Sequence, residues 1–368
     1  MKRVLPFLTL AAASLAACAL LVPFEDYQGE RSSGVDAGDA AIPSDAGRAP
    51  DGCRLSRWPD RPTTTDPGTG GPELVQGLTS FDLATKDGGV GFDLDGVCTC
   101  NPDPGSCTRA DAAPYCDEEG GVDHSANELA ETLAALAGTP TEVDRITRGE
   151  YSMLVRIRDY NGTADDPNVF VEVFSSPGLD GVQDGGPASP PTFDGTDVWT
   201  VDPSSLFLPK APPHIAVVFD EHAYVSQGTL VAMPSDPLTL KAGGISVLVR
   251  AVVITGKLRR EGGIFVIDEG VLVGRIRTTD FLTGLEAARD PITKGGVCGD
   301  AGLYPQLSPR ICEAADIMSD RGRDSTGSAC DAMSIAARFT TRPAILGPVY
   351  ARPRAARPCG DAWVGACP

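Results

Sequence analysis

The cysteines restrict the fold of this 368-residue chain more than any other feature, because ten of the eleven fall into two groups toward its ends. In an oxidising compartment we expect these ten to pair. Five cysteines cannot pair among themselves, so at least one disulfide should join the groups unless one thiol in each stays free. The groups are Cys53, Cys98, Cys100, Cys107 and Cys116, and Cys298, Cys312, Cys330, Cys359 and Cys367.

Zinc is the alternative for the first group, since four thiolates, those of Cys98, Cys100, Cys107 and Cys116, could bind it. Their spacing lacks the paired Cys-x-x-Cys knuckles of zinc sites. Disulfides are therefore the favoured interpretation.

Residues 1–17 have the pattern of a targeting segment. Lys2 and Arg3 precede 14 mostly apolar residues, whereas a helix that crosses a membrane needs about 20. The closing sequence Leu-Ala-Ala-Cys18 resembles the lipobox of bacterial lipoproteins. This resemblance implies cleavage before Cys18, a lipid anchor on its thiol and, because Ala19 rather than aspartate follows, a place in the outer membrane.

The next part of the chain, residues 18–52, is expected to be a disordered acidic tether. Stretches such as Gly34–Ala41 contain Asp, Ala and Gly and almost no large apolar side chains that could offset the entropy of ordering. Such tethers resemble those of uncharacterised myxobacterial outer-membrane lipoproteins. After cleavage, 29 basic and 50 acidic residues leave a net charge of −21, which disfavours nucleic acid as a partner.

Residues 53–276 are predicted to form a mainly β domain. Apolar side chains alternate with other residues over 151–158 and 169–174, as in strands with a buried face. Further candidate strands are residues 197–201, 214–219, 222–233, 246–258, 263–267 and 271–277, separated by Gly, Asp and Asn turns. This pattern favours an antiparallel β-sandwich, with a jelly-roll or concanavalin-like version preferred, and leaves the strand order open.

Helices are predicted at the edges of this domain. Ser125 and Glu128 form a capping box, a second helix should start near Thr279, and a third should start at Ser308-Pro309. Residues 277–368 are accordingly predicted to be a small helical cap sealed by disulfides, with Cys312 joined to the segment around Cys330.

The densest group of oxygen ligands surrounds Asp93 and Asp95 in Gly-Phe-Asp-Leu-Asp-Gly, with Asp123 further along the chain. Carboxylates held by glycines suit a structural calcium ion, which takes 6–8 oxygen ligands. The spacing excludes an EF-hand loop, and a solvated turn is the alternative. A second acidic loop, residues 159–168, is interpreted as a long turn, although rim loops of a sandwich also bind ligands.

Catalytic motifs are missing from the sequence. It contains no Gly-x-Ser-x-Gly, His-Glu-x-x-His, Walker or dinucleotide-binding motif. His222 with Ser226 would be a poor pair, because residues four apart on a strand lie roughly 13 Å apart. The favoured hypothesis is a non-enzymatic, lipid-anchored surface module that binds a glycan or an envelope protein. The alternative is a hydrolase that cleaves an envelope polysaccharide through paired carboxylates.

Overall fold

The computed structural model divides into two compact units, Met1–Ile42 and Pro43–Pro368, and every residue that it describes belongs to the second. The described residues are 55–63, 70–83, 90–100, 105–109, 116–127, 129, 142–181, 190–208, 214–242, 245–289, 295–298, 303–324, 327–351, 358–360, 363 and 365–367. Cys18, Cys53 and the residues of the predicted tether lie outside these ranges.

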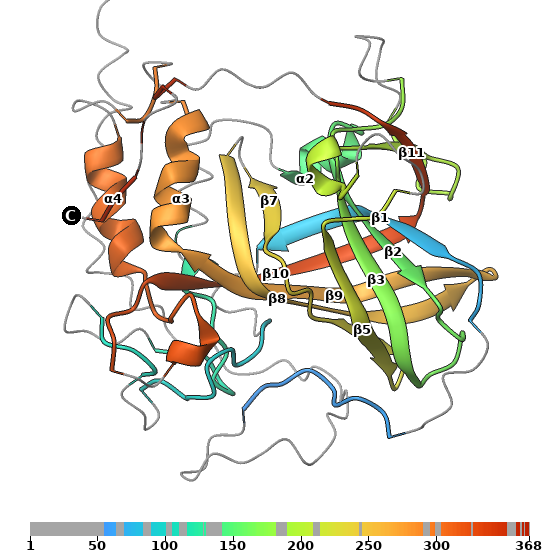
Figure 1. The fold of residues 1–368 in the computed structure, drawn as a ribbon, viewed down its shortest axis with the longest axis horizontal. Helices are drawn as coiled ribbons and strands as arrows, with labels where there is room; N and C mark the ends of the chain where they lie inside the picture. The colour runs from blue at the N-terminus through green and yellow to red at the C-terminus, as the bar shows by residue number, and fades with distance from the viewer. Residues whose placement is uncertain are drawn as a thin grey trace, which may run out of the picture. The chain divides into compact units, whose positions relative to one another are not determined.

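One nine-stranded antiparallel sheet dominates the domain (Figure 1), so the predicted fold class is confirmed. Its strands, in spatial order, are β6 (Thr229–Ala232), β5 (Val218–Ser226), β3 (Asp166–Ser176), β2 (Ser152–Arg158), β1 (Leu74–Leu83), β10 (Ala332–Pro343), β9 (Ile264–Arg277), β8 (Ile245–Glu261) and β7 (Leu238–Ala242). A further pairing of β6 with β8 closes eight of these strands into a ring. Most consecutive strands are neighbours, an order without the Greek-key connections of a jelly roll.

Side chains on the two faces of the strands enter different cores. Val155 in β2 and Leu272 in β9 belong to one core inside the ring, as a sandwich-like arrangement requires. Leu154 and Phe174 point outward and pack around Trp199 of β4 (Val198–Val201). This outer core explains why β2 and β3 are apolar on both faces. A short parallel sheet pairs β4 with β11 (Ile345–Val349).

Two predicted strand boundaries differ from the structure. The break expected near residue 220 lies instead at Gln227 and Gly228, which both have positive φ and form the turn between β5 and β6. The two strands predicted at residues 263–277 form the single strand β9. The pairing of β8 with β9 contains register shifts, so the strand continues where the alternation of apolar residues is interrupted.

The helical layer follows β9 and contains α3 (Thr278–Gly284) and α4 (Tyr304–Glu313). In α3, Phe281 and Leu282 are buried as predicted. Helix α4 begins four residues before the predicted start, because Pro305 rather than Pro309 occupies its first turn. A short helix, α2 (Glu142–Thr147), precedes β2, and the single helical turns are Pro203–Ser205, Leu285–Ala287 and Arg321–Arg323.

The prediction of residues 277–368 as a helical cap missed the strand β10. This strand lies in the middle of the sheet, between β1 and β9. Its alternation is hidden in the sequence because alanines fill several buried positions, including Ala336 and Ala337. A strand near the start of the described chain, β1, therefore pairs directly with a strand near its end, β10.

Disulfides reinforce this meeting of the chain ends. Cys107 and Cys330, 223 residues apart, form the predicted bond between the two groups. The other bridges join Cys100 to Cys116, Cys298 to Cys359 and Cys312 to Cys367.

Cys98 is also disulfide-bonded, so zinc ligation by the first group is excluded. The predicted partner of Cys312 was wrong, because the C-terminal segment folds back onto α4 and brings Cys367 to it.

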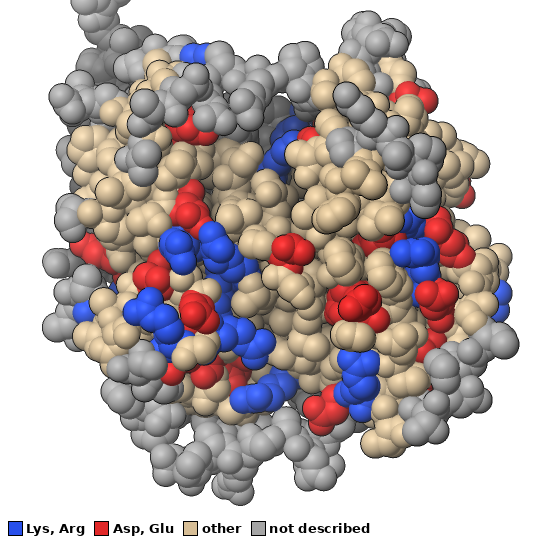
Figure 2. Space-filling view, viewed as in Figure 1, with Lys and Arg blue, Asp and Glu red and all other residues tan. Residues whose placement is uncertain are grey.

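Across the ranges described above, no helix is both long and apolar enough to span a membrane. On the face shown in Figure 2, acidic and basic side chains lie interspersed.

Candidate metal centre

The predicted metal ligands lie on two irregular segments that pack against the outer face of the sheet. Leu94, between Asp93 and Asp95, is buried in a core with Val253, Val273 and other side chains of β8–β10. Apolar burial of this one side chain anchors the loop. The two flanking carboxylates are thereby held next to Asp123, beneath the protein surface.

Backbone hydrogen bonds fix the two segments to each other. The Leu94 N–H donates to Oδ2 of Asp123 at 2.7 Å, and the Asp123 N–H donates to the Phe92 carbonyl at 3.3 Å. Gly91 has φ +146°, and a Cβ there would lie 2.7 Å from a methyl carbon of Val122. Only glycine at position 91 therefore lets these two segments of the chain approach so closely.

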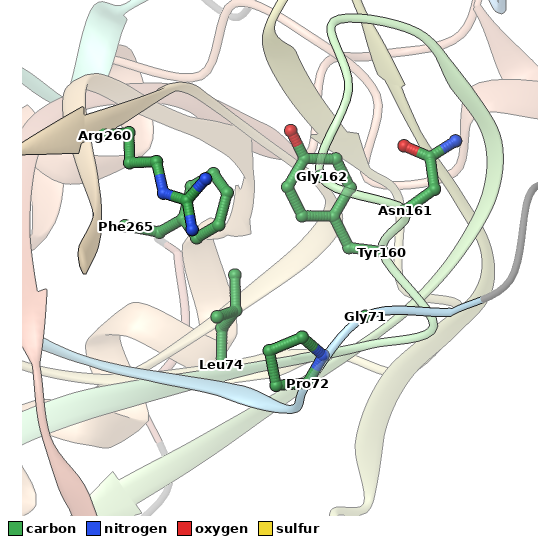
Figure 3. Close-up of a pocket in the computed structure, with 8 residues that line it drawn as sticks. All are labelled: Gly71, Pro72, Leu74, Tyr160, Asn161, Gly162, Arg260 and Phe265. Carbon is green, nitrogen blue, oxygen red and sulfur yellow. The ribbon is translucent and has the colours of Figure 1, made fainter. Parts of the chain in front are cut away.

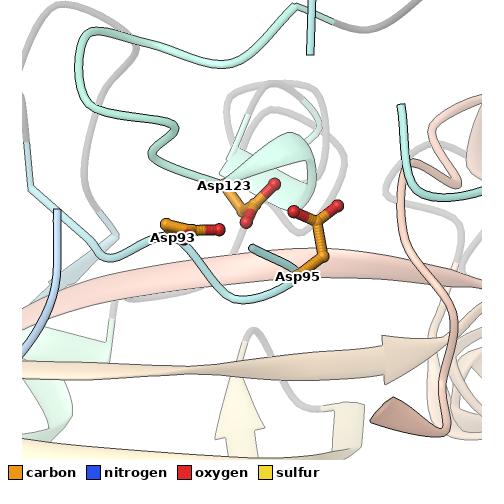
Figure 4. A group of neighbouring side chains, drawn as sticks. All are labelled: Asp93, Asp95 and Asp123. Atoms are coloured by element: carbon orange, nitrogen blue, oxygen red, sulfur yellow. The ribbon is translucent and has the colours of Figure 1, made fainter. Parts of the chain in front are cut away.

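The three carboxylates converge (Figure 4), and one ligand oxygen from each lies within 4.8 Å of the others. Asp93 and Asp123 are 3% and 2% exposed, and Asp95 is partly buried. Oδ1 of Asp93 accepts from the Gly96 N–H and Oδ1 of Asp95 from the Val97 N–H. Oδ2 of Asp95 is buried and has no hydrogen bond of normal geometry among the described residues, and the Ser106 hydroxyl lies beside this carboxylate.

Burial makes these carboxyl groups reluctant to ionise. Desolvation raises the pKa of Asp93 to about 6, and it raises the pKa of Asp123 well above its usual value, with further repulsion from Asp95. The pKa of Asp95 is raised mainly by burial as well. Without a bound cation, the ionised cluster is destabilised by both desolvation and mutual repulsion.

Two further aspartates extend the acidic cluster. Burial, with repulsion from Asp95 and Asp316, raises the pKa of Asp117 to about 8, while Oδ2 of Asp117 accepts from the Thr99 N–H. Asp316, which follows α4, accepts hydrogen bonds from the Ser125 and Ser334 hydroxyl groups. No local sequence pattern marks Asp316, because tertiary contacts bring it to the site.

The two arginines nearest to the acidic cluster do not neutralise its negative charge. Arg57 lies 3.3 Å from Oδ2 of Asp93, but its side chain is 48% exposed. Arg275 is buried and binds Asp324 through both terminal nitrogens, at 2.9 and 2.7 Å. Its remaining contacts are the carbonyls of Leu94 and Met318. The cluster can therefore accommodate a metal cation, for which it offers oxygen ligands only.

The second acidic loop uses its carboxylates to hold its own backbone. Asp166 accepts from the Asn161 and Asn168 N–H groups, and Asp165 accepts from the Gln227 N–H. These contacts agree with its interpretation as a long turn. On β5, the side chain of His222 is 76% exposed, whereas Ser226 is buried.

Searches against protein-family models, curated proteins and solved structures found no match to this chain. The geometry of the acidic cluster is consequently the main guide to function.

Proposed function

We propose that this protein is a lipid-anchored, non-enzymatic module of the bacterial cell envelope whose folded domain is stabilised by calcium. The observation that carries the calcium part is the buried convergence of Asp93, Asp95 and Asp123 without a matching set of cations. A divalent cation would supply the missing charge and would bind the buried Oδ2 of Asp95.

Calcium suits this geometry better than other common metals. Its oxygen ligands lie at about 2.3–2.6 Å, so two ligands on opposite sides of the ion are up to about 5 Å apart. The three carboxylate oxygens, within 4.8 Å of one another, fit that sphere. Magnesium demands a tighter octahedron at about 2.0–2.1 Å, and structural zinc prefers sulfur and nitrogen ligands. Water and carbonyl oxygens would complete the shell.

A thermal melt tests the calcium proposal. Calcium at 100 times its dissociation constant should add about 2.7 kcal/mol to the free energy of unfolding and raise the melting temperature by several degrees relative to chelator. The Asp123→Asn variant should lose this increment. Glu119→Gln, which removes an exposed charge from the same segment, should keep it. Equal melting temperatures in calcium and chelator would reject the proposal.

The anchor part rests on the sequence around Cys18. Metabolic labelling with an alkyne fatty acid, followed by membrane fractionation, should find the label on the wild-type protein in the outer membrane. The Cys18→Ser variant should be unlabelled. A labelled Cys18→Ser protein, or an unlabelled wild type, would contradict lipidation at this residue.

The hydrolase alternative would need paired carboxylates in a cleft. A pocket of the described chain is lined by Gly71, Pro72, Leu74, Tyr160, Asn161, Gly162, Arg260 and Phe265, and no carboxylate is among them. The geometry of this pocket favours binding over hydrolysis.

A further inference from the structure

This pocket, about 210 Å³ in volume, lies where the β8–β9 hairpin, the β2–β3 loop and the start of β1 meet. Figure 3 shows Arg260 and Phe265 on one side and Tyr160 on the other, with Leu74 and Pro72 between them. None of its lining residues belongs to the acidic cluster. It is therefore a separate candidate site.

The β8–β9 hairpin creates one wall. Gly262 and Gly263 both have positive φ, at 57° and 95°, as a two-residue turn between twisted strands requires. This turn pairs Arg260 directly with Phe265 across the hairpin. The guanidinium carbon of Arg260 lies 5.2 Å from the centre of the Phe265 ring, a cation–π contact that orients the guanidinium.

Tyr160 lies beside Phe265 and extends the apolar surface of the pocket. Its hydroxyl donates to the Thr163 carbonyl at 2.7 Å, so its own polar group is already satisfied. Its ring packs edge to face against Phe265, with 5.5 Å between ring centres. The floor formed by Leu74 and Pro72 is apolar as well.

Arg260 is the charged residue of the lining, and it has no carboxylate partner among the described residues. Its Nε donates to the Gly263 carbonyl at 3.3 Å, which leaves both terminal nitrogens to bind a ligand. The adjacent Arg259 is different, because it lies 2.5 Å from Glu269. In the pocket, Arg260 thus offers a forked donor, the geometry that suits a carboxylate.

We propose that this pocket binds one carboxylate-bearing sugar residue of a glycan, because at contact distance the charge of Arg260 outweighs the salt-screened net charge of the chain. The aromatic and apolar walls would contact the non-polar face of the sugar ring, and Arg260 would bind its carboxylate. A peptide that adds to a strand edge is the competing occupant, because the hairpin tip (258–261 and 264–268) pairs only within itself among the described strands. A sugar acid is favoured over a peptide because the pocket presents one forked cation beside apolar side chains.

Calorimetric titration of the protein with a short oligogalacturonate, in buffer without added calcium, tests the proposal. Arg260→Gln should weaken binding at least about tenfold, because a hydrogen bond to a charged group is lost. Arg259→Gln removes the same charge one residue away and should change affinity less than about twofold. Both side chains are exposed, and matching melting temperatures of the variants would confirm that each is folded.

Two comparison ligands complete the experiment. A neutral galactose oligomer should bind at least about tenfold more weakly than the oligogalacturonate. A short peptide ending in a phenylalanine carboxylate should not compete with it. The proposal is overturned by equal loss of affinity in both arginine variants, by equal binding of the neutral oligomer, by preference for the peptide, or by no binding of the oligogalacturonate.

Discussion

Two regions of the protein bury carboxylates in opposite ways. In the middle of β3, the side chain of Glu172 is fully buried and accepts hydrogen bonds from Arg156 at 2.7 Å and from the Ala216 N–H. Arg158 is a second cation at this site, with its Nε 3.2 Å from Oε2 of Glu172. The acidic cluster of Asp93, Asp95 and Asp123 has no comparable set of bound arginines.

The backbones that carry these groups also differ. Glu172 and Arg156 face each other on paired strands, so main-chain hydrogen bonds hold both partners in place. The acidic cluster lies on loops that are fixed by glycines, disulfides and the buried side chain of Leu94. Where strands set the geometry, the chain thus neutralises a buried carboxylate with its own arginines; where loops set it, the buried carboxylates keep most of their charge uncompensated.

The largest expected effect comes from removing the arginine that neutralises Glu172. Arg156→Met should lower the free energy of unfolding by about 3–5 kcal/mol, because Glu172 would stay buried without its main cation. Urea unfolding would measure the change, and the calcium increment should persist. Arg148→Met, which breaks the exposed pair with Glu150, should change stability by less than about 1 kcal/mol. A variant at Arg156 that is as stable as wild type would undermine the comparison.

Removing the bridge beside the cluster should act mainly on the loops. Replacing Cys100 and Cys116 by serine opens a short covalent loop and should cost about 3 kcal/mol. Calcium affinity should fall because the segments before and after the bridge carry the ligands. Hydrogen exchange should accelerate around Asp123 and remain slow in β2 and β3. Uniform acceleration through the whole sheet would show that the two regions are not separable.

The pH dependence of the metal-free protein should come next in size. The pKa of Asp93 is about 6 in the folded state against 3.8 for the free side chain. Between these values the folded state binds more protons, so the free energy of unfolding should fall as pH rises, by at most about 3 kcal/mol. Asp117, with its pKa raised to about 8, should extend the decline.

Thermal melts between pH 4 and 8 would measure this decline in chelator. Excess calcium should counter it, since the metal binds the ionised carboxylates and its affinity rises with pH. Asp93→Asn should flatten the part of the curve between about pH 4 and 6. Identical pH profiles with and without calcium would argue against a metal in the cluster.

The smallest effect is expected from Arg57. Because this half-exposed arginine lies beside Asp93, Arg57→Gln should remove some repulsion toward calcium and tighten its binding a few-fold at low salt. Stability should change by less than about 1 kcal/mol. Isothermal titration at two ionic strengths would measure the difference, which added salt should reduce. Weaker calcium binding in this variant would mean that Arg57 supports the loop rather than competing with the ion.

Local patterns predicted much of this architecture. Alternation identified β2, β3 and β8, and cysteine parity required the bond that Cys107 and Cys330 form. The missed strand β10 shows the limit of such patterns, because small buried residues give a weak alternation. At the candidate site, Asp93, Asp95 and Asp123 could be named from their density. Asp316 could not, since it is 193 residues from Asp123 and reaches the cluster through the contacts of β10 and α4.

The mainly antiparallel β fold, a bond between the two cysteine groups and the three clustered aspartates all follow from the amino-acid sequence. These are properties of periodicity, counting and local composition. The order of the strands in the closed ring, the partner of Cys312 and the contact of Tyr160 with Phe265 could not be read from such patterns. They depend on which distant segments pack together, and the same packing gives Glu172 its arginines and gathers Asp93, Asp95 and Asp123 into one cluster.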